Sequence, residues 1–136
     1  MNKNLNGLSG PASPKSLRIL VAEDDEINRM VIAAFLDDLP FLDVTTVEDG
    51  RAALEAATTT AFDLMIFDQN MPFITGDRVI RHLRASGTVN GNTPVIRLSA
   101  DTSVASTDAL HRTSSLPKPL HKDDFVRAIK RALKID

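Results

Sequence analysis

The sequence predicts an α/β domain built on a doubly wound parallel sheet. Short apolar runs alternate with segments whose apolar residues recur at helical spacing, and the alternation repeats along most of the chain. Most residues inside the runs are apolar, as in strands that are buried on both faces. Strands that alternate with helices form a parallel sheet covered on both sides, because right-handed crossovers carry each helix over the sheet.

The first half of the chain predicts three strands and two helices. These are, in order, the strand Leu17–Ala22, a helix over residues 27–39, the strand Val44–Val47, the helix Ala52–Ala57 and the strand Phe62–Phe67. The first helix should end before Pro40, because proline cannot continue a helix. Phe62–Phe67 is the most apolar of the runs, which favours a central place in the sheet.

The second half predicts two strands and three helices. These are the helix Gly76–Arg84, the strand Pro94–Leu98, a weak helix around Val104–His111, the strand Ser115–Pro117 and a closing helix. Gly87 suits a left-handed cap. The closing helix carries Phe125, Ile129 and Leu133 on one face. The stretch between Ser99 and Lys118 is polar and short, so we expect its helix, the fourth of five, to be short or mobile.

The size and composition of the chain fit one soluble domain. It has 136 residues, of which 43% are apolar and 25% charged, enough for a single core. Residues 1–16 are rich in Asn, Gly, Ser and Pro, so we expect a flexible leader or linker there and a folded domain over 17–136.

Charge and hydropathy exclude several classes of function. The formal net charge of −2 and the absence of a basic cluster argue against direct binding to nucleic acid. No apolar run approaches the roughly 20 residues that span a bilayer, and no signal peptide is evident, so we expect a cytoplasmic protein with no membrane contact. The absence of cysteine removes disulfides and thiolate metal sites.

Polar side chains follow four of the predicted strands. Glu23 and Asp24 follow the first, Asp68 the third, Ser99 the fourth, and Lys118 the fifth. Because parallel α/β sheets bind ligands at the carboxyl ends of their strands, we expect these side chains to meet in one site.

Three carboxylates in one site repel one another unless a cation lies among them. An all-oxygen ligand set, with no cysteine and no nearby histidine, favours Mg²⁺ or Mn²⁺. Such an ion would neutralise a phosphoryl group during transfer. Lys118 is suited to contacting the same phosphoryl oxygens or Asp68, and Ser99 offers a hydroxyl donor. The sequence therefore indicates a phosphoryl-accepting aspartate.

The motifs around these residues resemble the receiver domains of two-component signalling proteins. The resemblance covers nearly everything from Leu17 to Asp136. It rests on four segments in the family's order, Leu20-Val21-Ala22-Glu23-Asp24-Asp25, Asp68-Gln69-Asn70-Met71-Pro72 with Gly76, Leu98-Ser99-Ala100 and Leu116-Pro117-Lys118-Pro119. It implies a flavodoxin-like fold with strand order 2-1-3-4-5.

The resemblance also implies a role for each residue. Asp68 would be the phosphoacceptor and Asp24 a direct metal ligand, with Glu23 acting through a water. Asn70 would offer its backbone carbonyl to the metal. Ser99 would be the hydroxyl that moves toward the phosphoryl group, and Lys118 the family's lysine, followed by a bond to proline that is usually cis in this family.

The implied reaction moves a phosphoryl group from a phosphohistidine to Asp68, and water later hydrolyses the acyl phosphate. The chain would therefore be no enzyme beyond this self-phosphorylation and slow autodephosphorylation. The implied partner is a sensor histidine kinase or a histidine phosphotransfer protein, and the chain looks similar to receivers of hybrid kinases. Ile27, Asn28 and Met30 are candidates for the contact with that partner.

Two residues depart from expectation. The family often has an aromatic residue three positions before the lysine, where this chain has Ser115. For this reason, and because the fourth helix is weak, we expect a monomer that does not use the common dimer of the fourth helix, fifth strand and fifth helix.

Arg97 lies inside a strand, so its charged head must find a carboxylate or reach solvent, and the sequence leaves both open.

Other functions remain open from the residues alone. An aspartate-nucleophile phosphatase would want a second aspartate where Asn70 stands. A transcription factor would need an appended DNA-binding domain. A pseudo-receiver, a binding scaffold without phosphorylation, is the main alternative, since Ser115 replaces the usual aromatic residue.

Overall fold

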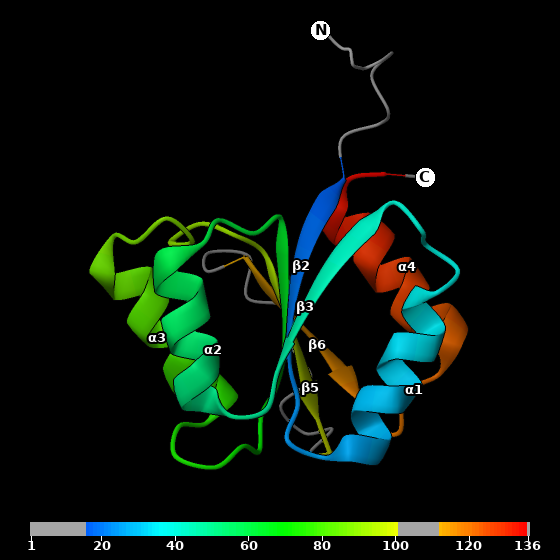
Figure 1. Cartoon of the computed structure of the whole chain (residues 1–136), viewed down its shortest axis with the longest axis horizontal. Helices are drawn as coiled ribbons and strands as arrows, with labels where there is room; N and C mark the ends of the chain where they lie inside the picture. The colour runs from blue at the N-terminus through cyan, green and yellow to red at the C-terminus, as the bar shows by residue number, and fades with distance from the viewer. Residues whose placement is uncertain (1–15, 101–111, 136) are drawn as a thin grey trace, which may run out of the picture.

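The computed structural model describes residues 16–100 and 112–135. Within them the chain forms five strands and four helices (Figure 1). The strands are β2 (Leu17–Ala22), β3 (Leu42–Val47), β4 (Leu64–Asp68), β5 (Val95–Ser99) and β6 (Thr113–Pro117). The helices are α1 (Glu26–Leu36), α2 (Gly50–Thr59), α3 (Gly76–Ser86) and α4 (Lys122–Leu133).

The strands form one parallel sheet in the order β3-β2-β4-β5-β6. In chain order this is 2-1-3-4-5, as the resemblance implied. Figure 1 shows α2 and α3 on one face of the sheet and α1 and α4 on the other. The prediction of a doubly wound α/β fold is therefore confirmed.

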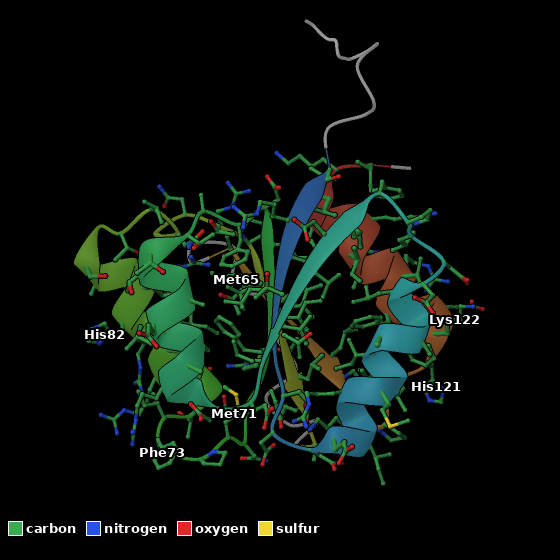
Figure 2. All side chains as sticks on the ribbon, in the orientation of Figure 1. Met65, Met71, Phe73, His82, His121 and Lys122 are labelled. Carbon is green, nitrogen blue, oxygen red and sulfur yellow. The ribbon has the colours of Figure 1, made fainter. Side chains whose placement is uncertain are left out.

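Each face of the sheet carries its own hydrophobic core, because neighbouring residues of a strand point to opposite sides. In β2, Leu20 and Ala22 pack toward α2 and α3, whereas Ile19 and Val21 pack toward α1 and α4. Met65 of β4 lies in the first of these cores (Figure 2). All five residues of β4 are buried, in agreement with the prediction that this strand is central.

The helix ends follow from local chemistry. Asp25, Asp49 and Thr75 cap α1, α2 and α3, and each side chain accepts a hydrogen bond from a backbone N–H of the first turn. Gly87 ends α3 with φ 65°, in the left-handed region, which confirms its prediction as a cap.

The first helix differs from its prediction. It ends at Leu36, where residues up to 39 were expected. On this helix Ile27 and Val31 are 69% and 38% exposed, whereas Ile32 and Leu36 are buried and Phe35 packs partly buried against the same core. The predicted fourth helix, Val104–His111, lies outside the described residues.

Candidate functional site

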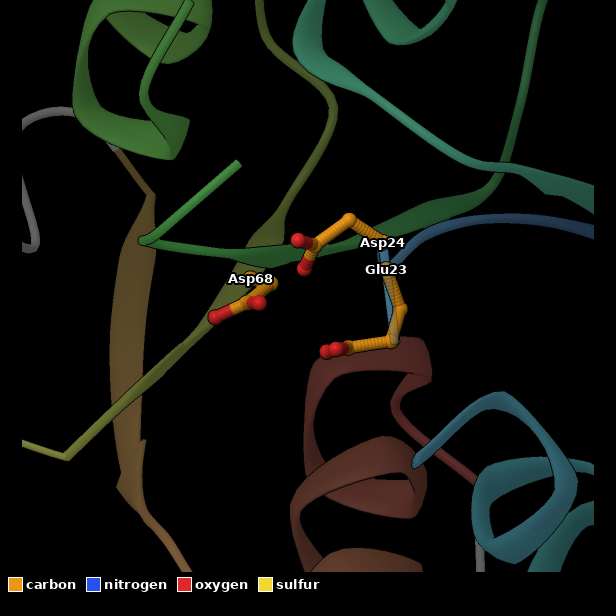
Figure 3. A group of neighbouring side chains, drawn as sticks. All are labelled: Glu23, Asp24 and Asp68. Atoms are coloured by element: carbon orange, nitrogen blue, oxygen red, sulfur yellow. The ribbon is translucent and has the colours of Figure 1, made fainter. Parts of the chain in front are cut away.

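Three carboxylates meet at the carboxyl edge of the sheet. Glu23 and Asp24 follow β2, and Asp68 is the last residue of β4. One oxygen from each lies within 4.8 Å of the others (Figure 3). Glu23 and Asp68 are 0% and 2% exposed, whereas Asp24 is open to solvent. The site is therefore a buried acidic pair with an exposed third acid at its mouth.

The sheet register brings these acids together. β2 and β4 are adjacent parallel strands in which Ala22 pairs with Phe67. The next residue of each strand, Glu23 and Asp68, therefore emerges at the same level of the same edge. Residues 45 positions apart in the sequence thus become neighbours, as expected for polar groups that follow adjacent strands.

Lys118 provides a positive charge among the carboxylates. Its Nζ lies 2.8 Å from Asp68 Oδ1 and 3.6 Å from Glu23 Oε2. Its backbone N–H donates to the carbonyl oxygen of Ser99 at 2.9 Å, which ties the ends of β6 and β5 together. The peptide bond between Lys118 and Pro119 is cis, as the resemblance implied.

The electrostatics of the site show more negative charge than one lysine offsets. Burial raises the pKa of the Glu23 carboxyl and the Asp68 charge raises it further, against the opposing effects of Lys118 and two hydrogen bonds. Burial lowers the pKa of the Lys118 amine, but its hydrogen bond to Asp68 and the two nearby negative charges outweigh this and raise it. Lys118 is therefore held in its charged form.

The carboxylates fit a hard divalent cation. Among the described residues, Glu23 Oε2 is a buried oxygen without a hydrogen-bond partner, although Lys118 Nζ is 3.6 Å away. A buried polar atom of this kind is costly unless something binds it. Clustered carboxylate oxygens are ligands that Mg²⁺ prefers, usually together with several waters.

The loop that follows β4 also holds Asp68 in place. The Asn70 N–H donates to Asp68 Oδ1 at 3.2 Å, and the Gly76 N–H donates to the Gln69 carbonyl at 3.1 Å. A Cβ on Gly76 would lie 2.7 Å from the Asp68 carbonyl oxygen, so only glycine allows α3 to approach this closely. The structure thus places Asn70 beside Asp68, while the metal-binding role of its carbonyl stays a prediction.

Ser99 lies at the same edge as the acids, at the end of β5 and half-buried. The structure therefore gathers all of the predicted site residues, from β2, β4, β5 and β6 and the loops that follow them. Their chemical roles remain predictions.

Two residues of α1 contact Glu23 that the sequence did not connect with the acids. Asn28 Nδ2 donates to Glu23 Oε1 at 3.3 Å, and Arg29 Nη1 donates to the Glu23 carbonyl oxygen at 2.8 Å. The sequence analysis considered Asn28 only as a partner contact. The position of Asn28 could have indicated this contact. Asn28 lies in the first turn of the helix that follows the acidic loop Glu23–Asp25, and side chains there lean back toward the start of the helix and can reach such a loop.

The structure answers the question left open for Arg97. Its guanidinium forms an ion pair with Asp77 of α3, and Nη2 donates to Ser115 Oγ of β6 at 2.8 Å. The head of Arg97 thus finds a carboxylate, and Ser115 is a partner of this arginine.

Within the part of the chain that the structure describes, no helix combines the length and the apolar character needed to cross a membrane.

Known proteins share this combination of fold and site. The family model of the response regulator receiver domain matches residues 19–130. The two-component response regulator ORR41 of Oryza sativa subsp. japonica is 33% identical over 115 residues, which cover 80% of this chain and 88% of that protein. The match therefore includes nearly all of a short response regulator.

Similar segments also occur inside much longer proteins. The autoinducer 2 sensor kinase/phosphatase LuxQ of Vibrio harveyi is 28% identical over 95 residues, which cover 70% of this chain but 11% of that protein. The chain therefore corresponds to a small part of that kinase.

The solved receiver domain of the sensor histidine kinase PA1611 from Pseudomonas aeruginosa PAO1 superimposes with a TM-score of 0.75 at 28% identity. The superposition covers 88% of this chain and 98% of that domain, which has a magnesium ion coordinated in its active site cleft. With the family model, the rice relative and this neighbour in agreement, the chain belongs to the response regulator receiver domains of two-component signalling.

Proposed function

We propose that the chain accepts a phosphoryl group on Asp68 from a phosphohistidine of a partner protein. Mg²⁺ would be bound by the acidic cluster, which consists of Glu23, Asp24 and Asp68. The observation that carries this proposal is the buried Asp68 carboxylate, 2.8 Å from Lys118 Nζ and grouped with two further acids at the carboxyl edge of the sheet. A nucleophile, a fixed positive charge and a set of metal ligands are thereby within reach of one phosphoryl group.

In the proposed reaction an Asp68 oxygen attacks phosphorus while the bond from phosphorus to the histidine nitrogen breaks, and the imidazole leaves. The product is an acyl phosphate. Water later attacks the same phosphorus, inorganic phosphate leaves, and the Asp68 carboxylate is restored. The chemistry is confined to the protein's own aspartate, so we expect no turnover of a separate substrate.

Each residue of the site has a proposed part in this reaction. Asp24, Asp68 and the Asn70 carbonyl would bind the ion directly, and Glu23 would act through a water. The ion, when bound, would neutralise charge on the phosphoryl oxygens. Lys118, which pairs with Asp68 before transfer, would contact a phosphoryl oxygen afterwards, and Ser99 would donate its hydroxyl to another.

We propose a sensor histidine kinase or histidine phosphotransfer protein as the phosphoryl donor. The exposed apolar side chains of Ile27 and Met30, at 69% and 65%, lie on the helix that follows the acidic loop and offer a contact surface beside the site. We further propose a monomeric, cytoplasmic domain over residues 17–136, with residues 1–16 as a leader or linker. It would switch conformation to control a partner or a fused module.

The test is intact-mass analysis after incubation with acetyl phosphate, with and without Mg²⁺. We expect wild type to gain one phosphoryl group only with Mg²⁺ and the variant Asp68→Asn to gain none. Asp43→Asn is a matched control, since Asp43 is an exposed acid on β3 outside the acidic cluster. An adduct on Asp68→Asn would reject Asp68 as the acceptor, and the absence of any adduct on wild type would favour a scaffold without phosphorylation.

A further inference from the structure

The two carboxylate oxygens of Glu23 have different surroundings. Oε1 accepts hydrogen bonds from the Asp25 N–H at 3.2 Å and from Asn28 Nδ2 at 3.3 Å. Oε2 has no hydrogen-bond partner among residues 16–100 and 112–135 and lies 3.6 Å from Lys118 Nζ. One oxygen is therefore held by two hydrogen bonds, while the other has none and lies near Lys118, whose Nζ pairs with Asp68.

Asn28 reaches Glu23 from a fixed position. Asp25 caps the helix that carries Asn28 by accepting a hydrogen bond from the Ile27 N–H at 3.3 Å. Arg29 of the same helix donates to the Glu23 carbonyl oxygen at 2.8 Å. The start of α1 and the acidic loop are thus bound together, and Asn28 is the residue of α1 whose side chain meets the carboxylate of Glu23. A carboxylate only accepts hydrogen bonds, so the NH₂ group of Asn28 must face it.

A cavity beside the acid gives the Asn28 hydrogen bond its importance. Glu23, Asn28 and Lys118 line a cavity of ≈ 200 Å³, together with apolar side chains that include Val31 and Leu98. A glutamate without the amide contact would have space to rotate toward this cavity. Its second oxygen would then leave its position beside Lys118, the lysine that pairs with Asp68.

We propose that Asn28 is a positioning residue for the metal site: it donates to Oε1 of Glu23 and so keeps Oε2 placed to act, through a water, on the divalent cation that Asp24 and Asp68 would bind. Asn28 itself is no ligand, and it touches none of the reacting atoms. The inference rests on the proposed magnesium-dependent function. Outer residues that orient a ligand in this way commonly change metal affinity about 10- to 100-fold when they are replaced.

The test measures Mg²⁺ binding by calorimetry on the unphosphorylated protein. The variant Asn28→Leu keeps the number and branching of the side-chain heavy atoms but lacks the donor, and we expect about tenfold weaker binding. Asn28→Gln retains an amide on a longer stem and should recover part of the affinity. Ala33→Ser is the matched control, since Ala33 lies on the same helix, is exposed and has no part in the proposed site. Its affinity should equal that of wild type.

Kinetics with acetyl phosphate separate positioning from other roles. For Asn28→Leu, the Mg²⁺ concentration that gives half-maximal phosphorylation should rise by the same factor as the dissociation constant. The rate at saturating Mg²⁺ should change little, because Asn28 does not contact the phosphoryl group. A fall in melting temperature alone would not produce this separation. If the leucine variant does not fold, Asn28→Ser carries the same expectation, because serine is too short to reach Oε1.

The outcomes distinguish this inference from the function on which it rests. Equal Mg²⁺ affinity for wild type and Asn28→Leu would overturn the positioning role and leave the proposed function intact. A lower rate at saturating Mg²⁺ with unchanged affinity would also overturn it. If wild type binds no Mg²⁺, the metal-dependent function fails and the inference fails with it.

Discussion

Replacing Lys118 by methionine removes the cation nearest to Asp68 and keeps an apolar stem of similar length. The 2.8 Å between Nζ and Asp68 Oδ1 corresponds to an attraction of about 6 kcal/mol at an effective dielectric constant of roughly 20. Desolvation of both groups offsets much of it. Since the lysine side chain is 23% exposed, we expect the free energy of unfolding to fall by about 2–3 kcal/mol, less than the loss of a partner in a fully buried pair.

Bound Mg²⁺ should reduce this difference. In metal-free buffer the variant leaves Glu23 and Asp68 without their nearby cation, whereas a divalent ion in the acidic cluster supplies the missing positive charge. A ligand that binds the folded state stabilises it in proportion to the logarithm of its concentration over its dissociation constant. Because the ion no longer competes with the lysine for Asp68, Mg²⁺ should stabilise Lys118→Met more than wild type.

The assay is urea unfolding followed by far-UV circular dichroism, with and without Mg²⁺, since the chain has no tryptophan. Lys122→Met is the matched control, because Lys122 pairs with Asp38 away from the site and is exposed. Mg²⁺ should stabilise Lys122→Met by the same amount as it stabilises wild type. A Lys118→Met protein as stable as wild type without metal, or an equal effect of Mg²⁺ on both proteins, would refute the reasoning.

Three further predictions concern stability. Because the pKa of Glu23 is raised in the folded state, its ionisation costs stability above pH 4.5; Glu23→Gln should therefore be more stable than wild type at pH 7 without metal, and urea titrations should show the gap closing as the pH falls toward 4.5. Asn90→Ala should lose about 3 kcal/mol in urea titrations, because the buried amide satisfies the Phe62 N–H and the carbonyls of Ala57 and Thr60; a loss below about 1 kcal/mol would contradict this. Asp77→Ala should be less stable than Arg97→Met, since the side chain of Asp77 is 39% exposed and that of Arg97 11%; the reverse order by the same titration would mean that the arginine is not held by this ion pair.

Much of the fold was predictable because it follows from residue patterns in short windows. The run Phe62–Phe67 is apolar except for Asp63, and β4 is a fully buried central strand at Leu64–Asp68. Phe125, Ile129 and Leu133 were predicted to share one face of the closing helix; in α4 the first two are buried, and Leu133 packs partly buried against the same core. The acids could be grouped because residues that follow parallel strands meet at one edge of the sheet.

The misses have a common physical cause, which is contact between distant segments. In α1 the pair Ile27 and Val31 and the pair Ile32 and Leu36 both have helical spacing. Only the packing against the sheet and α4 decides that the second pair is buried while Ile27 is exposed. Arg97 pairs with Asp77, 20 positions earlier, and no local pattern indicates this partner.

Asn90 and Arg84 are polar residues whose contacts with distant segments could not be predicted from the sequence either. The buried Asn90 amide joins the end of α2 to the chain before β4, about 30 positions away. Arg84 donates to the carbonyls of Asn90, Gly91 and Thr93 in the loop before β5. Such residues are common in surface loops, so their types alone do not indicate a buried role.

The most direct test of the central claim is to locate the phosphoryl group. Borohydride reduces an aspartyl phosphate to homoserine, and peptide mass spectrometry then identifies the modified position. After incubation with acetyl phosphate and Mg²⁺, the account predicts homoserine at Asp68 and unmodified Asp24 and Glu23. Homoserine at Asp24, or a protein that gains no homoserine at all under these conditions, would contradict it.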